Sequence, residues 1–431
     1  VMGWEEAMFD PDDISRLTGL ITRVLNEPDF RQQLREHGRQ RAGLFCWRTT
    51  ARELLGNVEA LVASARPDST TATDNPIPVL ARLCATWGLS DEHLRQLANS
   101  LATNELTAVE QRPEHTYHWR IEGPFDSSYS LALLNREIAR GLSAIGQTVS
   151  LHSSEGPGDF DPDPDFLARN PDIANLHAHA GKPELAQGIT SRNLFPPRVD
   201  DFPDGPAFLH LYAWEESGFP QDWVAAFNSH LTGLTCLSEH VRKVLIDNGV
   251  CLPMAVSGCG VDHWERVTPR HYPAPGSGFR FLHVSSCFPR KGLDALLDAW
   301  GRAFTRRDSV CLIIKTFSNP HNNVEAQLAA HREANPDYPD VEVLCEDLPD
   351  AQLKSLYEQC DALVAPSRAE GFGLPLAEAM LSGLPVITTG WSGQLDFCNS
   401  DTAWLTDFQF EPAQTHFELP DSVWASPDPE H

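Results

Sequence analysis

Residues 362–388 read ALVAPSRAEGFGLPLAEAMLSGLPVIT, and this stretch indicates the fold. A short apolar run is followed by a loop with two glycines, and an alanine-rich segment then leads to a second apolar run. Pro375 suits the first turn of a helix, whose free N–H groups face the end of the preceding strand. The stretch therefore predicts a strand, a ligand-binding loop, a helix and a second strand.

The same alternation extends to both sides of this stretch, and it is typical of parallel α/β sheets. Towards the C-terminus, strands are predicted at 279–285, 310–316, 341–344, 362–365 and 385–388, with helices beginning near Gly292, Val324, Ala351 and Pro375. Towards the N-terminus, strands are predicted near 117–121, 147–152, 173–177, 207–212 and 233–237, with helices near 129–144, 220–231 and 239–248. We expect two facing Rossmann-like domains with a cleft between them.

The first 114 residues have a different pattern. Apolar residues at helical spacing predict helices between 10 and 63 and a helical hairpin at 79–110. The polar, proline-rich stretch 64–78 is typical of a linker, as is 267–278. The expected organisation is a helical segment (1–65), a linker with a hairpin (66–114), an N-terminal Rossmann-like domain (115–268) and a C-terminal one (276–431).

Composition excludes several function classes. Thirty-three basic and 60 acidic residues give a net charge of −27, which repels nucleic acid and anionic lipid, so a phosphate ligand requires a local basic pocket. The sequence has no run of 18 apolar residues and no secretion signal at its start, so we expect a cytoplasmic protein. The ten cysteines lack metal-ligand spacing and most lie in apolar stretches, which predicts buried, reduced thiols.

Two carboxylates, Glu370 and Glu378, flank the glycine loop. The first precedes the loop and the second lies one turn into the predicted helix. Because ligands of open parallel sheets bind at the carboxyl ends of the strands, we expect both side chains at one crevice. Carboxylates accept hydrogen bonds from pairs of hydroxyls, which fits a sugar or a ribose. An ordinary capped helix is the alternative.

These residues resemble a known family. Glu370, seven residues and Glu378, with Gly-Phe-Gly after the first glutamate and SGLPVIT at 382–388, are similar to the signature of retaining GT-B glycosyltransferases of family four, also called group 1. That family builds bacterial polysaccharides and lipopolysaccharide, including O-antigen. The resemblance implies that Glu370 and the backbone of the loop hold the donor sugar and that Glu378 binds the ribose. The loop residues are Gly371, Phe372, Gly373 and Leu374.

Adjacent cations, Arg290 and Lys291, follow the predicted strand at 279–285 and precede a helix. A nucleoside diphosphate needs cationic neutralisation, which an Arg beside a Lys at a helix N-terminus supplies. By the resemblance, this pair grips the pyrophosphate, although other members place an Arg nearer the strand, where this chain has Ser286. A solvated surface pair is the alternative.

Two further positions in the N-terminal half are candidates. Gly123 follows the first predicted strand, where the family has a glycine loop near the donor phosphates, but the usual double glycine is missing and a plain connection is equally consistent. Some members carry a histidine that faces the donor sugar, and His210 matches its place at the end of a predicted strand. His177 and His179 are rivals, and a histidine satisfied by local hydrogen bonds is the alternative for each.

The resemblance implies a UDP- or GDP-sugar donor, no other cofactor and no metal. The aspartates at 159, 161, 163 and 165 alternate with prolines and Phe160, so we interpret them as an acidic surface loop. Expected partners are the nucleotide sugar and a glycan or lipid-linked glycan acceptor, with no nucleic acid, in the cytoplasm or at the inner membrane face.

The ends of the chain raise a question of organisation. Residues 9–63 resemble the helices that close the C-terminal domain in the family, and the chain stops before such helices. A piece of a larger enzyme with adjacent glycosyltransferase modules and a permuted module both explain this pattern. We favour the first, because the chain starts at Val1 without an initiator methionine.

The predicted function is therefore a retaining glycosyltransferase that extends a cell-surface polysaccharide or a similar glycan. The main alternative is a non-catalytic GT-B scaffold module within a larger tandem enzyme. A phosphorylase with pyridoxal phosphate and a sugar-binding protein are further alternatives.

Overall fold

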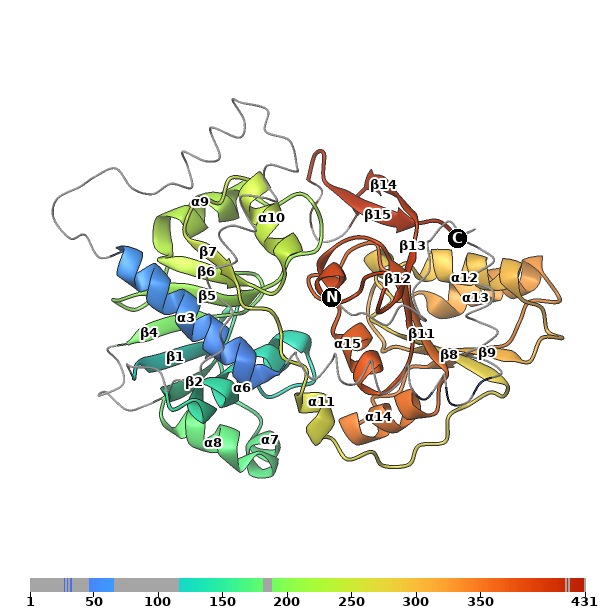
Figure 1. Ribbon diagram of the computed structural model, residues 1–431, viewed down its shortest axis with the longest axis horizontal. Helices are drawn as coiled ribbons and strands as arrows, with labels where there is room; N and C mark the ends of the chain where they lie inside the picture. The colour runs from blue at the N-terminus through green and yellow to red at the C-terminus, as the bar shows by residue number, and fades with distance from the viewer. Residues whose placement is uncertain are drawn as a thin grey trace.

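The computed structural model describes residues 46–65, 116–180, 188–414, 417 and 419–429, together with the single residues 27, 29 and 32. The helices expected between 10 and 45, the linker at 66–78 and the hairpin at 79–110 lie outside these residues. Figure 1 shows two α/β lobes side by side, each built around one sheet. The predicted fold class, two facing Rossmann-like domains with an additional N-terminal helix, is confirmed.

The N-terminal sheet has seven strands in the order β3-β2-β1-β4-β5-β6-β7, and only the short β3 is antiparallel. The strands are β1 (His118–Gly123), β2 (Thr148–Glu155), β3 (Gly158–Asp159), β4 (Ile189–Arg192), β5 (Ala207–Tyr212), β6 (Gly233–Cys236) and β7 (Met254–Val256). Helices α6 (Ser130–Ala144), α7 (Pro164–Arg169), α8 (Pro171–Ala178), α9 (Gln221–His230) and α10 (Glu239–Asp247) connect them. The order reverses between β1 and β4, which makes their carboxyl ends the switch point of this sheet.

One predicted strand in this domain is wrong. Residues 173–177 lie in helix α8, where Pro171 occupies the first turn and Ile173 and Leu176, three residues apart, are both buried. The strand next to β1 is instead β4, whose ITSR sequence lacks an apolar run. Its Arg192 is buried in an ion pair with Glu122 of β1 at 2.5 Å. Only pairing with distant residues makes so polar a segment a buried strand.

The C-terminal sheet has six parallel strands in the order β10-β9-β8-β11-β12-β13. They are β8 (Phe279–Val284), β9 (Val310–Lys315), β10 (Val341–Leu344), β11 (Ala362–Ala365), β12 (Val386–Thr389) and β13 (Trp404–Thr406). The intervening helices and turns are η3 (Pro289–Lys291), α12 (Leu293–Ala303), α13 (Val324–Ala334), α14 (Asp350–Glu358), α15 (Leu374–Leu381) and η4 (Gly393–Asp396). The order reverses between β8 and β11, so the loops after these two strands meet.

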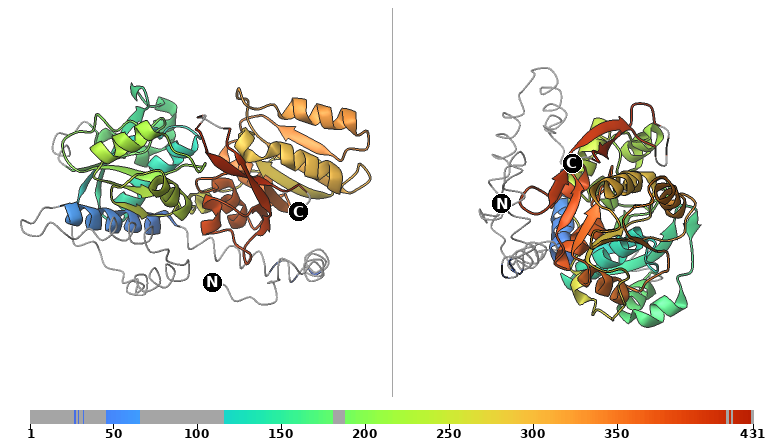
Figure 2. Two further views of the ribbon diagram at one scale, coloured as in Figure 1. Left: turned by 90° about the horizontal axis from the view of Figure 1, so that it is seen from above. Right: turned by 90° about the vertical axis from the view of Figure 1, so that its right-hand side faces the viewer.

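An antiparallel hairpin of β14 (Phe408–Pro412) and β15 (Val423–Pro427), which the sequence pattern did not predict, follows the C-terminal sheet. It reaches the N-terminal domain, where Gly218 N–H donates to Ser422 Oγ at 3.1 Å. Figure 2 shows the two lobes from two further directions. The hairpin segment therefore connects the two domains.

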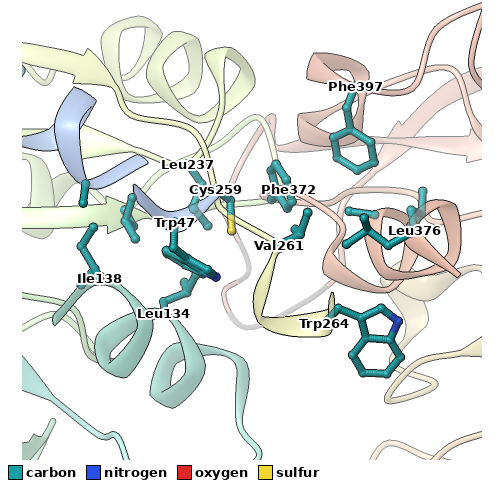
Figure 3. Packing of buried hydrophobic residues seen from close by; sticks show 14 of the residues in the cluster. Trp47, Leu134, Ile138, Leu237, Cys259, Val261, Trp264, Phe372, Leu376 and Phe397 are labelled. Atoms are coloured by element: carbon teal, nitrogen blue, oxygen red, sulfur yellow. The ribbon is translucent and has the colours of Figure 1, made fainter. Parts of the chain in front are cut away.

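Helix α3 (Trp47–Ala65) packs against α6 and β6 of the N-terminal domain. Its Trp47 belongs to one apolar cluster that continues through Val261 and Trp264 of the interdomain connection to Phe372 and Leu376 of the C-terminal domain (Figure 3). The short helix α11 (His263–Arg266) lies in that connection. The N-terminal helix is therefore part of the junction between the two domains.

Two general properties follow from the described residues. None of the helices in this part of the chain has the length and hydropathy that a transmembrane span requires. Its cysteines are free thiols; most are buried, as predicted, while Cys251 and Cys345 are exposed.

Candidate active site

The loops after β8 and β11 can pack closely because the residue at their contact is a glycine. Gly292 has a φ of 68°, and a Cβ at this position would lie 2.0 Å from the carbonyl oxygen of Pro366. Only glycine permits both this φ and this approach. The N–H of Arg368 then donates to the carbonyl of Arg290 at 2.7 Å, which joins the two loops. This hydrogen bond holds the cationic turn η3 beside Glu370, which lies two residues after Arg368.

Glu370 is buried among three side chains that approach its carboxylate. Lys291 Nζ donates to Oε1 at 2.5 Å, and Ser367 Oγ donates to the same oxygen at 2.8 Å. Arg290 Nη1 lies 3.6 Å from Oε2. The structure thus brings together Glu370, Lys291 and Arg290, as the sequence predicts for a cleft that binds a charged ligand, and the alternative of a solvated surface pair does not describe these cations.

A third loop, after β12, supports this cluster. Ser392 Oγ accepts the N–H of Glu370 at 2.9 Å, and the N–H of Gly393 donates to the carbonyl of Glu370 at 2.9 Å. Ser392 adopts a φ of 85°, which is rare for a residue with a side chain and is found preferentially at functional sites. The loop after β12 therefore holds the backbone of Glu370 through two hydrogen bonds.

Charge and burial oppose each other in this cluster. Burial acts to raise the pKa of Glu370, but the charges of Lys291 and Arg290 outweigh it and lower the pKa below its ordinary value. Burial and the charge of Arg290 lower the pKa of Lys291. Burial also acts to lower the pKa of Arg290, yet Glu215 and Glu370 raise it overall. Such buried charges are costly, which makes the cluster a candidate for function.

The N-terminal domain contributes a second carboxylate, Glu215, which the sequence analysis did not select. It follows β5 and pairs with Arg290 Nη2 of the C-terminal domain at 3.1 Å. The cluster thus holds two cations and two carboxylates. One signal was present in the sequence, the two adjacent glutamates shortly after a buried strand. It did not indicate that one of them has a partner in the other domain.

The second glutamate of the predicted pair, Glu378, has separate neighbours. It lies on α15, and His263 Nε2 of the interdomain connection is 3.4 Å from its Oε1. Trp47 Nε1 donates to the other ring nitrogen of His263 at 3.2 Å, so Nε2 carries the hydrogen and donates to the carboxylate. No hydrogen bond or ion pair among the described residues links a common partner to Glu370 and Glu378. We expected both carboxylates in one crevice, but the structure gives each of them its own set of hydrogen-bonding partners.

The glycine loop between these glutamates turns tightly. Gly373 has a φ of 94° and caps α15. The carbonyl of Gly371 accepts a hydrogen bond from Ser238 Oγ of the N-terminal domain at 2.7 Å. Phe372 is buried against Phe397, with ring centroids 4.8 Å apart. Leu374 begins the helix, so the loop offers backbone groups, rather than side chains, to a ligand.

The histidine candidates lie inside the N-terminal domain. His210 is fully buried; its Nδ1 is 2.9 Å from Ser191 Oγ and its Nε2 is 2.8 Å from Asn135 Oδ1. Burial lowers the pKa of His210 to about 3, which keeps the ring neutral. The rivals His177 and His179 are hydrogen-bonded to backbone carbonyls of β2. In this arrangement all three match the alternative of a locally satisfied histidine.

Gly123 is positioned by packing. A Cβ there would lie 2.3 Å from the Asn135 side chain and 2.3 Å from the carbonyl of Asn193. Asn135 Nδ2 also donates to the carbonyls of Pro124 and Asn193, both at 2.9 Å. The glycine therefore lets β1 end against α6 at the switch point, and the described structure gives it no contact with the cations of the C-terminal domain.

Known proteins share this C-terminal domain. Residues 278–412 match the family described as glycosyl transferases group 1, which bears out the predicted resemblance for this part of the chain. The chain is 24% identical over 437 residues to the serotype-specific mannosyltransferase WbdA of Escherichia coli, covering 90% of this chain and 50% of that protein. The chain spans about half the length of the curated relatives it matches.

Solved structures with a general likeness include a UDP-forming α,α-trehalose-phosphate synthase from Burkholderia xenovorans. It is 12% identical with a TM-score of 0.44, and the match covers 65% of this chain and 86% of that one. The E. coli trehalose-6-phosphate protein bound with UDP-2-fluoro glucose is 12% identical with a TM-score of 0.41, over 54% of this chain and 64% of that one.

Proposed function

We propose that this chain is a retaining glycosyltransferase that takes a sugar from a UDP- or GDP-sugar without a metal ion. The observation that carries the proposal is the buried cluster of Glu370, Lys291 and Arg290 at the switch point of the C-terminal sheet. This domain matches the group 1 family over residues 278–412, which supports a nucleotide-sugar donor and a glycan acceptor.

In the proposed mechanism, the two cations face the diphosphate. As the bond between the sugar and the diphosphate breaks, negative charge grows on the leaving group, and Lys291 and Arg290 stabilise it. Glu370 and the N–H and C=O groups of the 371–374 backbone hold the sugar while positive charge develops on its ring. The acceptor hydroxyl then attacks from the side of the departing diphosphate, whose oxygen takes the proton.

Glu215 is the group that the donor displaces in this mechanism. Its carboxylate pairs with Arg290 Nη2 at 3.1 Å, and a phosphate oxygen can take the same place beside the guanidinium. Glu370 remains, because Lys291 and Ser367 both donate hydrogen bonds to its carboxylate. Glu378, which His263 orients, accepts the ribose hydroxyls.

A separate cavity of about 440 Å³ does not compete for this role. It lies between α12 and the β14–β15 hairpin. Its lining includes four carboxylates and one cation, Arg368, which is already paired with Asp294 at 2.8 Å; the other three carboxylates are Asp298, Glu411 and Asp428. These carboxylates repel a diphosphate. The acceptor in our proposal is a growing cell-surface polysaccharide or a lipid-linked glycan in the cytoplasm, and the mannosyltransferase named among the relatives makes mannose the first sugar to test.

The proposal is tested with Lys291→Ala and a panel of nucleoside diphosphates in calorimetry, followed by a donor screen by mass spectrometry. We expect the wild-type protein to bind UDP or GDP and the variant to lose about 10²-fold or more in kcat/KM, because a buried charge-assisted contact to the leaving group is lost. Lys243→Ala, which removes an exposed lysine paired with Asp247 on α10, is the matched control.

Removing Lys291 leaves the buried negative charge of Glu370 with only Arg290 beside it, which can destabilise the fold. Thermal unfolding is therefore measured for both variants. A folded Lys291→Ala protein with wild-type affinity and turnover contradicts the proposed placement of the diphosphate. A wild-type protein that binds no nucleoside diphosphate contradicts the proposed function itself.

A further inference from the structure

A second cavity lies in the N-terminal domain, beside the last residues of β2. Its volume is about 170 Å³, which is the size of one hexose ring rather than of a nucleotide. The residues on which the inference depends are His152, Ser153, Asp159, Phe160 and Asp161. The proposed mechanism uses none of them.

Ser153 and His152 give the cavity neutral hydrogen-bonding groups. Ser153 is only 6% exposed, and its hydroxyl has no hydrogen-bond partner in the described part of the chain. Buried hydroxyls are normally paired, so this one indicates a ligand or a water. Burial and the charge of Arg120 lower the pKa of His152 to about 4, so its imidazole is neutral near pH 7. Its Nε2 lies 3.2 Å from Ser150 Oγ, which leaves Nδ1 as the ring nitrogen for a ligand.

Phe160 and the aspartates complete the lining with different chemistry. Phe160 is 36% exposed, which leaves ring surface for a ligand. Asp159 and Asp161 add carboxylates that accept hydroxyl hydrogens and repel phosphate. A pyranose combines an apolar C–H face with hydroxyls that both donate and accept. The lining thus suits a neutral sugar and disfavours an anion.

The cavity lies at the same carboxyl edge of the N-terminal sheet as Glu215, the residue that reaches the proposed donor site. Glu155 ends β2, two residues after Ser153, and Glu215 follows β5 and pairs with Arg290. Tyr129 caps the N-terminus of α6, which follows β1, so it lies at this carboxyl edge as well. Burial and then the charges of Glu155 and Glu215 raise the pKa of Tyr129 to about 12. Its side chain is 45% exposed and is free to contact a ligand that extends along this edge.

We propose that the 170 Å³ cavity binds one neutral hexose of the acceptor glycan, with the chain of sugars passing Tyr129 toward the donor cations. The assignment of this sugar to the acceptor rests on the proposed glycosyltransferase function. Hexose binding in the cavity does not, so the two can fail separately.

The test is saturation-transfer NMR and calorimetry on the whole chain with methyl α-glycosides of mannose, glucose and galactose and with their α-linked disaccharides. We expect at least one glycoside to bind, with or without saturating UDP or GDP. Phe160→Ala and Ser153→Val should each weaken this binding about tenfold, because one removes the ring surface and the other the hydroxyl. Phe410→Ala, which removes an exposed phenylalanine of β14, is the matched control and should bind as wild type.

Thermal unfolding identifies a variant that has lost its fold, and the remaining variant then decides the result. If no glycoside binds while UDP or GDP does, or if binding is the same in both cavity variants, the cavity holds water only or the sugar lies elsewhere, and the inference is overturned. If a glycoside binds in the cavity and no nucleoside diphosphate binds anywhere, the inference stands as a sugar site and the proposed function fails.

Discussion

The carboxyl edges of the two sheets face each other, and they differ in the charge of their buried polar side chains. In the C-terminal domain, Glu370, Lys291 and Arg290 are charged and buried together. In the N-terminal domain, His210 and Asn135 pair with no formal charge, at 2.8 Å. A neutral network satisfies buried polar groups and fixes the backbone at small cost, whereas buried charges cost desolvation free energy. The comparison indicates that the charged edge is kept for a ligand and the neutral edge for structure.

After the loss expected for Lys291→Ala, the next largest effect is expected from Glu378, on the charged side of the comparison. Glu378→Gln replaces a carboxylate, which accepts two ribose hydroxyls, with an amide that accepts through only one atom. We expect the affinity for UDP or GDP to fall about tenfold, or about 1.4 kcal/mol, in calorimetry. Glu358→Gln on the exposed face of α14 is the control. Equal affinity in the two variants would place the ribose away from Glu378.

A smaller effect of the opposite sign is expected from Glu215, the residue that links the two edges. Glu215→Gln removes the carboxylate that competes with a phosphate for Arg290, which lies 3.1 Å away. We expect nucleoside diphosphate affinity to rise about fivefold, because this competition is lost. Glu265→Gln, an exposed residue of α11, should leave affinity unchanged. A fall in affinity would show instead that Glu215 holds Arg290 in its binding position.

The smallest effect on activity is expected from His210, on the neutral side. His210→Gln keeps a donor and an acceptor, so turnover should stay within about threefold while stability at pH 7 falls by about 1 kcal/mol. A loss of about 10²-fold in a folded variant would give His210 a catalytic role after all.

The same variant has a defined pH signature. The folded pKa of His210 is lowered to about 3 from the ordinary 6.5, so between these values the unfolded chain takes up a proton that the folded chain refuses. Wild-type stability therefore falls as the pH falls through this window, and His210→Gln should show a shallower decline in urea unfolding. Identical pH slopes would mean that the ring titrates in the folded state.

Local sequence predicted most elements of the C-terminal domain. Helix α12 begins directly after Gly292 and α15 begins beside Pro375, and the backbone preferences of these two residues act within one turn. The same reasoning failed at β4, whose buried Arg192 needs Glu122 of another strand. It also left out the β14–β15 hairpin. Wherever burial came from a distant partner, pattern alone misled or gave no signal.

The amino-acid order alone determined the glycine loop, the flanking Glu370 and Glu378 and the adjacent cations, because strand ends, glycine turns and helix starts are set by neighbours along the chain. Only the tertiary structure decided that Glu215 meets Arg290, that Trp47 and His263 orient Glu378, and that His210 is enclosed. These outcomes depend on which buried charge or hydrogen-bonding group finds a partner once the sheets have packed. Desolvation requires that every buried polar group has a partner, but local sequence does not determine which residue that partner is.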